Sequence, residues 1–587
     1  MIDTNIIRKS ITSLSTPQAR DGGLNPGVTV LPKGFRRAEG CRPLQVNTVW
    51  ERDLVIPLRD GTALRADIFR PTDCMDKIPI LLVWSPYGKT GTGMFSLDLI
   101  QGRDGIPLDR LSGFECFEGP DPAEWNAHGY AVAQVDARGI FHSEGNHLWH
   151  GTAEGRDGYD TIEYLAKLDW TNGHVALIGN SWLATAQWFI AAERPPHLSC
   201  ILPLEGLSDV YRESLCRGGV PYTPFWEFLR DNGLYGKNEQ EDAVAMIQKY
   251  PLMDEYWDDK RAKAHLIQVP AYVLASMSTG LHTVGSIRCY EDIPHDNKWL
   301  RITATQEWHD LYQPETIVDL RRFLDYYTKG IPNDWEATPR VRAAILRFNQ
   351  SPLVNIPFSS WPPPHTTYEK YYLAPGGELK RHLPEVISGS ASYQSDVPAF
   401  QMDNDPEEVC FSFVFDKRTT IFGPSRVVLY MSCLDHDELD VFVQLRKVNQ
   451  RGQILQNINI PLQHLGLQSE EEVESINTLK YLGPTGVLRV SHRALDPLLS
   501  KPHWPAHDHS RISPVPAGTI VQLEIGLWPA AIQFEAGERM MLKIAGHQMT
   551  LAEFVPLRGR FTTGNKGKHH VYFGDHSSHL LIPTVPL

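Results

Sequence analysis

A strand-to-helix transition around a serine constrains this chain more than any other feature. The stretch "HVALIGNSWLATAQW" (residues 174–188) starts with an unbroken apolar run, 175–178, and passes through Gly-Asn-Ser into a segment of helical character, 182–193. An apolar strand that turns abruptly through a serine into a helix is typical of a nucleophile elbow, where the turn exposes the hydroxyl. We therefore predict that Ser181 is a nucleophile. The alternative role for Ser181 is a helix N-cap, a position that serine also favours.

Comparable apolar runs recur through the first half of the chain. Helix-like segments separate several of them, for example residues 155–168. The runs are residues 78–87, 130–139, 174–181, 200–206, 269–278 and 297–305. Continuously apolar strands that alternate with helices favour a mostly parallel sheet covered on both faces. Ahead of them, residues 54–71 alternate around Asp60-Gly61, which predicts a β-hairpin with a tight turn.

The pattern changes after residue 334. Short alternating segments bounded by Gly, Pro or Asp follow, and they predict an antiparallel β-sandwich. Residues 207–268 are rich in Trp, Tyr and charge and have no clear strand, so we expect an inserted helical cap. The expected organisation is a surface-lying N-terminal arm (1–45), an α/β core in two parts (46–206 and 269–334), the cap (207–268) and the sandwich (335–587).

Composition excludes several classes of protein. The 587 residues carry a formal net charge of -14 and no long Lys/Arg run, which argues against nucleic acid or an anionic membrane as partner. No stretch approaches the ~20 apolar residues of a membrane-spanning helix, and the N-terminus lacks the apolar core of a signal peptide. The eight cysteines are scattered without a CxxC pair, which is typical of reduced thiols. We expect an intracellular, cytoplasmic protein.

Several longer motifs give the chain a family resemblance. They are "IPLRDGTALRADIFRP" (56–71), "SPYGK" (85–89), "VDARGIFHSEG" (135–145), "EGRDGYDTIEYLAKLDWTNGHVALIGNSW" (154–182), "GVLRVSHR" (486–493) and "LWPAAIQFEAGERMMLKIAG" (527–546). In this order they resemble the cocaine-esterase-like (CocE/NonD) hydrolases, relatives of X-prolyl dipeptidyl aminopeptidases and α-amino-acid ester hydrolases. The resemblance runs from about residue 48 to the end. It implies an α/β hydrolase domain with a helical cap insertion, followed by a C-terminal jelly-roll β-sandwich.

The resemblance also implies an oxyanion hole. Tyr87 matches the family's oxyanion tyrosine, and the backbone N–H of Trp182 is the second donor. Losing one such donor typically costs about 100- to 1,000-fold in rate. The chain departs from the family's Gly-x-Ser-Tyr-x-Gly pattern at two positions: Trp182 replaces the tyrosine and Ala184 the last glycine. Trp182 still supplies its N–H, and Ala184 is small enough for close packing of helix on strand.

The catalytic base is less clear. In the family a histidine follows the last strand of the sheet in a context similar to Pro-Trp-x-His. The corresponding loop here is "TATQEWHDLY" (303–312), in which His309 directly follows Trp308 and the proline is missing. His309 is the first candidate. His282, in the preceding loop, is the alternative.

The triad acid has no clear candidate. The family places an aspartate after the sixth or seventh strand, but the aligned stretch "ASMSTGLH" (275–282) holds no carboxylate. An orienting acid fixes the histidine tautomer and stabilises the imidazolium, and its loss can cost about 10⁴ in rate. Two substitutes are available: Asp209, which follows the preceding strand, and Asp310, beside His309. We rank Asp209 first, because a residue adjacent to a histidine in sequence rarely reaches that histidine well.

We expect neither a cofactor nor a metal. The histidine-rich segments at 142–150, 503–510 and 569–579 lack a recognised ligand spacing and are interpreted as solvated loops. The aromatic side chains of the cap favour an apolar or aromatic small-molecule substrate, although such residues also form a cap's own core. We expect no nucleic-acid or membrane partner, and a homo-oligomer is compatible with the sequence.

Three functions fit these features. The first is a serine hydrolase that cleaves an ester or amide through an acyl-enzyme on Ser181. The second is a non-hydrolytic acyl transferase or cyclase-like enzyme with a degenerate triad, which the missing acid motivates. The third is a catalytically silent hydrolase fold that binds a ligand or partner.

Overall fold

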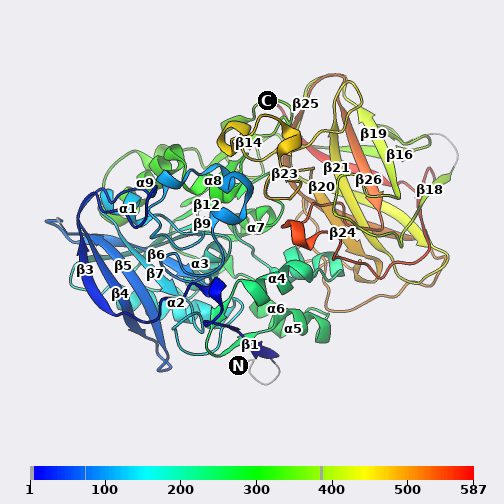
Figure 1. Cartoon of the computed structure of the whole chain (residues 1–587). Coiled ribbons are helices and arrows are strands. Elements are labelled where there is room, and N and C mark those ends of the chain that lie inside the picture. Colours follow the sequence, from blue (N-terminus) through cyan, green and yellow to red (C-terminus); the bar gives the residue numbers. More distant parts are fainter. Residues whose placement is uncertain (1–5, 73, 384–387) are drawn as a thin grey trace.

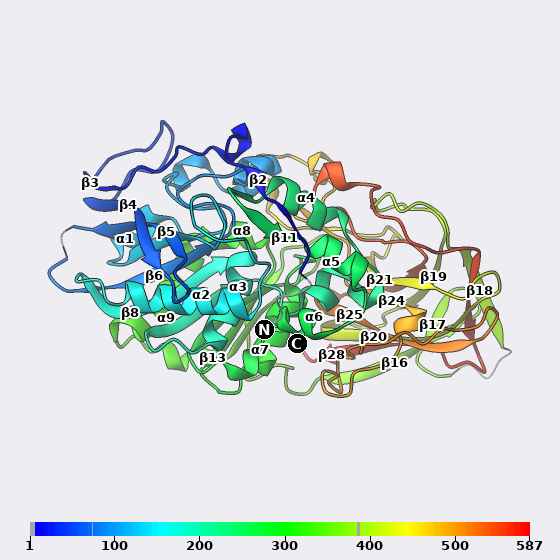
Figure 2. The same ribbon diagram turned by 90° about the horizontal axis from the view of Figure 1, so that it is seen from below.

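The chain folds into an α/β part and a strand-rich C-terminal part that lie side by side (Figure 1). The computed structural model describes residues 6–72, 74–383 and 388–587, so the first five residues of the predicted N-terminal arm lie outside the described residues. Helices α4 (Pro224–Asn232), α5 (Ala243–Lys249) and α6 (Glu255–Asp259) come from the predicted cap segment. Figures 1 and 2 both place them next to the junction of the two parts.

The α/β part is built on one mixed sheet of order β15-β14-β13-β12-β9-β8-β6-β7-β5-β4-β3. Its seven central strands run parallel to one another. These are β6 (Ile78–Ser85), β7 (Ala131–Asp136), β8 (Thr171–Asn180), β9 (Leu198–Leu204), β12 (Ala271–Ser276), β13 (Lys298–Thr303) and β14 (Val341–Ile345). The six predicted apolar strands and their parallel pairing are confirmed. They read as unbroken apolar runs because helices cover both faces of such a sheet.

The predicted hairpin is also confirmed. Strands β4 (Thr48–Pro57) and β5 (Ala63–Pro71) pair in antiparallel register, Leu54 opposite Ala66. The turn is wider than the two residues expected from Asp60-Gly61. Leu58 N–H bonds the Thr62 carbonyl at 2.8 Å, which leaves three residues in the loop.

Among the described residues, no helix is long and apolar enough to cross a membrane.

Helices pack against the sheet of the α/β part. The principal helices of this part are α1 (Pro122–Ala127), α2 (Thr152–Leu165), α3 (Trp182–Ala192), α7 (Thr283–Asp292), α8 (Glu307–Leu311) and α9 (Pro314–Lys329). Helix α3 is buried along most of its length and packs on α2, β8 and β9.

The N-terminal arm is more integrated than a surface-lying segment. Strands β1 (Arg8–Ser10) and β2 (Thr12–Ser13) pair with β11 (Glu239–Glu241) and β10 (Tyr235–Gly236) of the 207–268 segment. Strand β3 (Gly27–Leu31) pairs with β4 and forms one edge of the main sheet. The 207–268 segment therefore contains two short strands that its sequence did not indicate, because strands of two or three residues carry no periodic signal.

The C-terminal part holds a second large sheet, of order β18-β27-β20-β28-β16-β17-β19-β26-β21-β24, with β25 paired to β20. Most of its pairs are antiparallel. Its longest strands are β20 (Thr419–Cys433), β25 (Val521–Phe534), β21 (Asp440–Val448) and β16 (Thr367–Ala374). The others are β17 (Glu378–Lys380), β18 (Gly389–Gln394), β19 (Glu408–Val414), β24 (Thr485–Arg489), β26 (Arg539–Ala545), β27 (Lys568–Phe573) and β28 (His579–Val585). The boundary expected at 334/335 does not separate the two sheets. Strands β14 and β15 (Leu353–Phe358) follow that boundary and extend the first sheet as an antiparallel pair beside β13.

Candidate active site

The carboxyl ends of the parallel strands form the site. In open α/β sheets ligands bind at this edge. Ser181 follows β8 there, with φ 54° and ψ -118°, a backbone conformation that non-glycine residues rarely adopt. Gly179 allows the sharp turn, since a Cβ at that position would lie 2.6 Å from the Leu183 Cβ. Ser181 N–H donates to the Glu205 carbonyl at 2.8 Å, and no side-chain cap bond forms, so the hydroxyl is left available.

Tyr87 lies next to Ser181. It follows β6, is 5% exposed, and its phenol faces the Ser181 side chain. Phe95 and Phe117 pack edge-on against its ring, with centroids 5.3 and 5.6 Å away. Burial raises the pKa of the Tyr87 phenol well above its ordinary value, so it stays a hydrogen-bond donor. The structure thus brings Tyr87 and Ser181 together, as the sequence predicted.

Trp182 contributes its backbone to the site, because its indole points away from the cavity. Trp182 Nε1 donates to Glu154 at 3.2 Å, and its ring lies 4.2 Å from the His150 ring. His150 is 2% exposed and lies 3.0 Å from the same glutamate. This histidine-rich segment is therefore packed beneath the elbow and is not the solvated loop expected from its polarity; the apolar residues interleaved with it allowed the burial.

Glu118 is a site residue that the sequence did not reveal. It is 3% exposed, its carboxyl faces the Ser181 side chain and the Trp182 amide, and Trp308 Nε1 donates to it at 3.1 Å. Burial and the nearby Glu307 raise the pKa of Glu118 well above its ordinary value. A carboxyl held neutral can share donors with an oxyanion hole, whereas an ionised one would oppose the developing negative charge.

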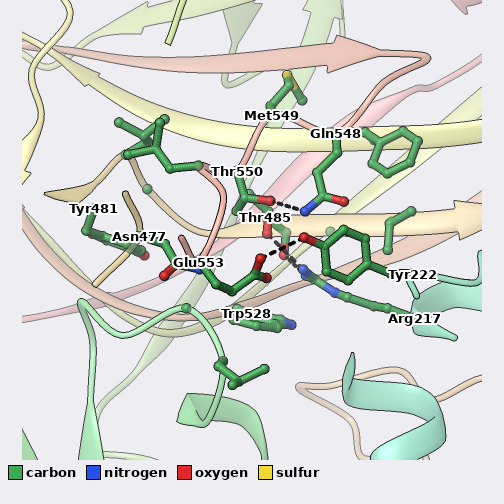
Figure 3. A pocket seen from close by; sticks show the side chains of 18 of the residues that line it. Arg217, Tyr222, Asn477, Tyr481, Thr485, Trp528, Gln548, Met549, Thr550 and Glu553 are labelled. Carbon is green, nitrogen blue, oxygen red and sulfur yellow. Dashed lines mark hydrogen bonds between the residues drawn. The ribbon is translucent and has the colours of Figure 1, made fainter. Parts of the chain in front are cut away.

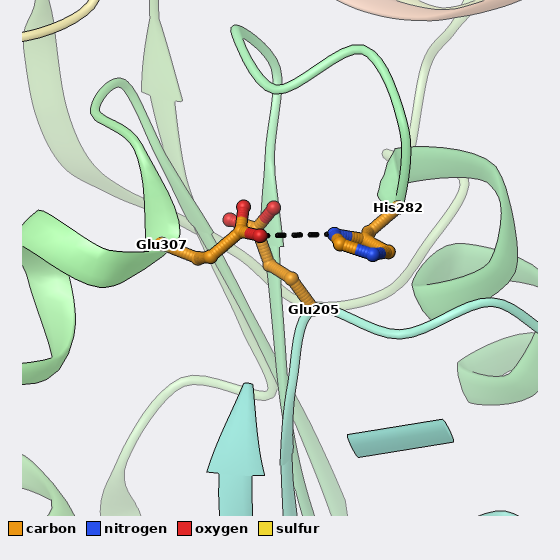
Figure 4. A group of neighbouring side chains, drawn as sticks. All are labelled: Glu205, His282 and Glu307. Atoms are coloured by element: carbon orange, nitrogen blue, oxygen red, sulfur yellow. Dashed lines mark ion pairs between the residues drawn. The ribbon is translucent and has the colours of Figure 1, made fainter. Parts of the chain in front are cut away.

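A histidine and two glutamates converge in the site (Figure 4), and two of them, His282 and Glu307, line the same cavity as Ser181. His282 follows β12, and its Nδ1 lies 3.1 Å from Glu307 Oε1, which follows β13. Glu205 follows β9 and completes the cluster. All three side chains are at most 3% exposed. Burial, and secondarily Glu307, raise the pKa of Glu205 well above its ordinary value, so one carboxyl of the pair is neutral.

Compared with what the family resemblance implied, the histidine and the acid have exchanged places between the loops after β12 and β13. A histidine stands after β12, where an acid was expected, and an acid stands after β13, where a histidine was expected. Nδ1 of His282 lies within ion-pair distance of Glu307, although the contact does not have hydrogen-bond geometry. The sequence pointed to His282 only as the alternative base. A carboxylate directly before Trp308 was the available signal for Glu307.

The same three side chains are the described residues best placed to hold a metal. One ligand atom from each of Glu205, His282 and Glu307 lies within 4.8 Å of the others. One imidazole and two carboxylates form a plausible donor set for Zn²⁺ or a similar ion with an open coordination position. Such an ion would occupy the histidine that the triad arrangement needs, so the two roles exclude each other.

His309 lies away from the serine cavity. Its Nδ1 donates to the Asp104 carbonyl at 2.9 Å, and its Nε2 lies 3.3 Å from His464 Nδ1. Residues 307 and 309 are two positions apart on helix α8, about 200° around the axis. Since Glu307 faces the cavity, His309 must face the opposite side. The geometry does not favour His309 as the base.

The two proposed acids are not near Ser181 either. Asp209 forms an ion pair with Arg212, 2.8 Å between Oδ2 and NH1, and lines a neighbouring cavity. Asp310 accepts a hydrogen bond from the Thr305 hydroxyl. Its carboxyl is buried, and the positive charge of Arg301 acts on it. Neither carboxyl lines the cavity that contains Ser181.

The cavity at Ser181 has a volume of about 620 Å³. Its polar and charged lining residues are Tyr87, Glu118, Ser181, Thr279, His282, Gln306, Glu307, Asn477, Thr478 and Glu553. Most of its remaining wall is apolar and is contributed by three regions of the chain: Phe95, Phe117 and Leu281 from the α/β part, Phe225 and Leu229 from α4, and Phe554 from the C-terminal part. The serine therefore faces a largely apolar chamber closed by the insertion and the C-terminal part.

Comparisons with known proteins agree with this architecture. Residues 60–238 match the X-Pro dipeptidyl-peptidase (S15 family) model, and residues 333–582 match the X-Pro dipeptidyl-peptidase C-terminal non-catalytic domain. A CocE/NonD family hydrolase from Staphylococcus aureus superposes with a TM-score of 0.83 and 29% identity, over 98% of this chain and 99% of that one. An α-amino acid ester hydrolase shares the fold, with a TM-score of 0.69 and 17% identity, over 94% and 98% of the two chains.

Cocaine esterase of Rhodococcus sp. (strain MB1 Bresler) is 31% identical over 210 residues, which is 35% of this chain and 33% of that enzyme. This match thus spans a third of the relative's length. The chain thus has the two successive domains of S15-type hydrolases, and in sequence and fold it resembles the cocaine-esterase-like (CocE/NonD) hydrolases.

Proposed function

We propose that this protein is a serine esterase or amidase that forms an acyl-enzyme on Ser181. One observation carries the proposal: a strained, solvent-reachable serine shares a largely apolar cavity with the Tyr87 phenol and with a histidine whose Nδ1 lies 3.1 Å from a buried carboxylate. We assign the base to His282 and the orienting acid to Glu307, in place of His309 and Asp209.

The reaction follows from these positions. Ser181 Oγ attacks the carbonyl carbon of the substrate while its proton passes to His282 Nε2. The oxyanion accepts hydrogen bonds from the Tyr87 phenol and the Trp182 N–H. The C–O or C–N bond then breaks, and His282 returns the proton to the leaving oxygen or nitrogen. Water, deprotonated by His282, attacks the acyl-enzyme, the carboxylic acid leaves, and Ser181 regains its proton.

Glu118 sets a condition on this cycle. Its carboxyl lies where the substrate carbonyl oxygen must approach the Trp182 amide, so binding has to displace it or share the donors with it. A neutral Glu118 can do either without electrostatic penalty. We also infer that residues 207–268 act as a helical cap and that the C-terminal part is a jelly-roll wall of the pocket, since each contributes side chains to the cavity at Ser181.

Turnover of 4-nitrophenyl esters of short and aromatic acids tests the proposal, with Ser181→Ala as the comparison. We expect ester cleavage by the folded wild type, none above background in Ser181→Ala, and one ¹⁸O atom in the acid product when the reaction is run in H₂¹⁸O. An absence of ¹⁸O during substrate turnover would instead indicate acyl transfer or cyclisation. A folded wild type that cleaves nothing would favour a binding role.

A further inference from the structure

The cavity at Ser181 adjoins a larger one that is lined by the insertion and the C-terminal part. The second cavity has a volume of about 980 Å³ and shares Gly280, Leu281, Asn477 and Glu553 with the first. Figure 3 shows its walls, which carry side chains from the insertion and from the C-terminal strands. Because the two cavities share these wall residues, they lie next to each other.

Arg217 is held in the wall of the second cavity (Figure 3). Its NH1 donates to the Thr485 hydroxyl at 2.9 Å and its NH2 to the Thr485 carbonyl. The guanidinium carbon lies 4.1 Å from the centre of the Trp528 ring, so the plane is supported from one side. A guanidinium has five N–H donors, and these contacts use two of them. The others remain for a ligand.

Arg217 has no carboxylate partner among the residues that the structure describes. Its neighbour Arg212, by contrast, forms an ion pair with Asp209 at 2.8 Å. Burial lowers the pKa of Arg217 to about 9, and no nearby charge offsets this effect. The Arg217 side chain is half-buried. Arginines removed from water are normally paired, because an isolated charge with little access to water is unfavourable. An uncompensated guanidinium in a cavity wall indicates that the counter-charge comes from a ligand.

The acids in the same cavity do not supply that counter-charge. Glu553 accepts a hydrogen bond from the Tyr222 phenol at 2.7 Å, and burial raises the pKa of Glu553 to about 7. Glu213 accepts hydrogen bonds from Ser208 N–H and the Ser208 hydroxyl, and burial raises the pKa of Glu213 to about 7. Both carboxyls are thus committed to protein donors and partly protonated near neutral pH.

We propose that Arg217 binds a carboxylate of the substrate, so that the enzyme acts on esters or amides that carry a carboxylate remote from the bond they break. The proposal rests on the proposed hydrolase function and requires that a bound substrate span both cavities, from Ser181 in the first to Arg217 in the wall of the second. A carboxylate matches the planar N–H pairs of the guanidinium, and Trp528 flanks the same place with an apolar face.

Paired substrates test this specificity. Monoesters of 4-nitrophenol with dicarboxylic acids of four to ten carbons are compared with 4-nitrophenyl esters of monocarboxylic acids of equal length. In wild type we expect kcat/KM for the anionic ester to exceed that for the neutral one at a preferred length. Arg217→Met should lower this ratio about 10- to 100-fold, the range expected for a charge-assisted hydrogen bond. Arg217→Lys, which keeps the charge without the fork, should fall between.

Arg418→Met is the matched control, because Arg418 is an exposed arginine paired with Glu535; the ratio should stay at its wild-type value. Since Arg217→Met could misfold, dicarboxylates are also tested in wild type as competitive inhibitors of neutral-ester cleavage, with inhibition expected at the preferred length. A wild type without preference for anionic esters and without this inhibition overturns the proposal, as does a ratio unchanged in folded Arg217→Met.

A measurement of dicarboxylate binding tests the carboxylate site independently of the proposed esterase function. Calorimetric titration of Ser181→Ala with the preferred dicarboxylate needs no catalysis, and Ser181→Ala/Arg217→Met should bind about 10- to 100-fold more weakly. Arg217-dependent binding in a protein that cleaves no ester supports the carboxylate site and rejects the esterase. Ester cleavage without Arg217-dependent binding supports the esterase and rejects the carboxylate site.

Discussion

Replacing Glu118 by Gln tests the charge state of the carboxyl beside the nucleophile. Burial raises the pKa of Glu118 well above its ordinary value, so its carboxyl stays neutral to a higher pH than an exposed glutamate and ionises as the pH rises through that elevated value. The resulting carboxylate would lie beside the oxyanion. At a separation of about 4 Å and an effective dielectric constant of about 20, two unit charges interact by about 4 kcal/mol. Ionisation should therefore slow acylation by roughly 10³-fold.

The assay is the pH dependence of kcat/KM for a neutral 4-nitrophenyl ester. Wild type should lose activity on the alkaline side, whereas Glu118→Gln, which cannot ionise, should lack that loss. Glu115→Gln is the control: burial raises the pKa of Glu115 to about 8, but its carboxyl does not line the cavity at Ser181. An alkaline loss that persists in Glu118→Gln, or that Glu115→Gln removes equally, would refute the reasoning.

Three further predictions concern the same site. Glu307→Gln should lower kcat by about 10⁴-fold, because the amide disfavours the working histidine tautomer. Glu205→Gln should lower kcat far less, since the Glu205 carboxyl is already neutral. Equal losses of kcat in steady-state kinetics would contradict these roles. Dialysis against EDTA should leave activity unchanged and millimolar Zn²⁺ should inhibit by binding the cluster; loss with EDTA and recovery with metal would show a metalloenzyme instead. Gly179→Ala should lower the free energy of unfolding by about 2 kcal/mol and suppress turnover, because the new Cβ meets Leu183. A denaturant midpoint and a turnover rate equal to those of wild type would mean that the elbow tolerates a side chain.

Much of the α/β part could be predicted because its signals are local. A strand such as β8 is buried on both faces, so its apolar run is visible in the sequence alone. The elbow follows directly from that strand, and the family resemblance at residues 85–89 implied Tyr87, which lines the same cavity as Ser181. The joining of β14 and β15 to the first sheet has no such signal, because it depends on which distant strand they pair with.

The base and acid were harder to predict for a related reason. His282 and Glu307 lie on loops after different strands, and only the parallel pairing of β12 with β13 brings those loops together. The sequence around His309 was closer to the family's histidine motif than the sequence around His282. However, His309 is two residues after Glu307 on helix α8, and this rotation turns its side chain away from the cavity that Glu307 faces. Glu118 comes from a loop with no motif, and its position beside Ser181 is visible only in three dimensions.

Labelling with a fluorophosphonate probe tests the central claim most directly. Wild type, Ser181→Ala, His282→Ala and His309→Ala are each confirmed as folded by thermal melting, and the adduct is located by mass spectrometry. We predict an adduct on Ser181 whose rate of formation falls by at least about 10³-fold in His282→Ala and stays near wild type in His309→Ala. Rapid labelling of Ser181 in His282→Ala, with slow labelling in His309→Ala, would contradict the account.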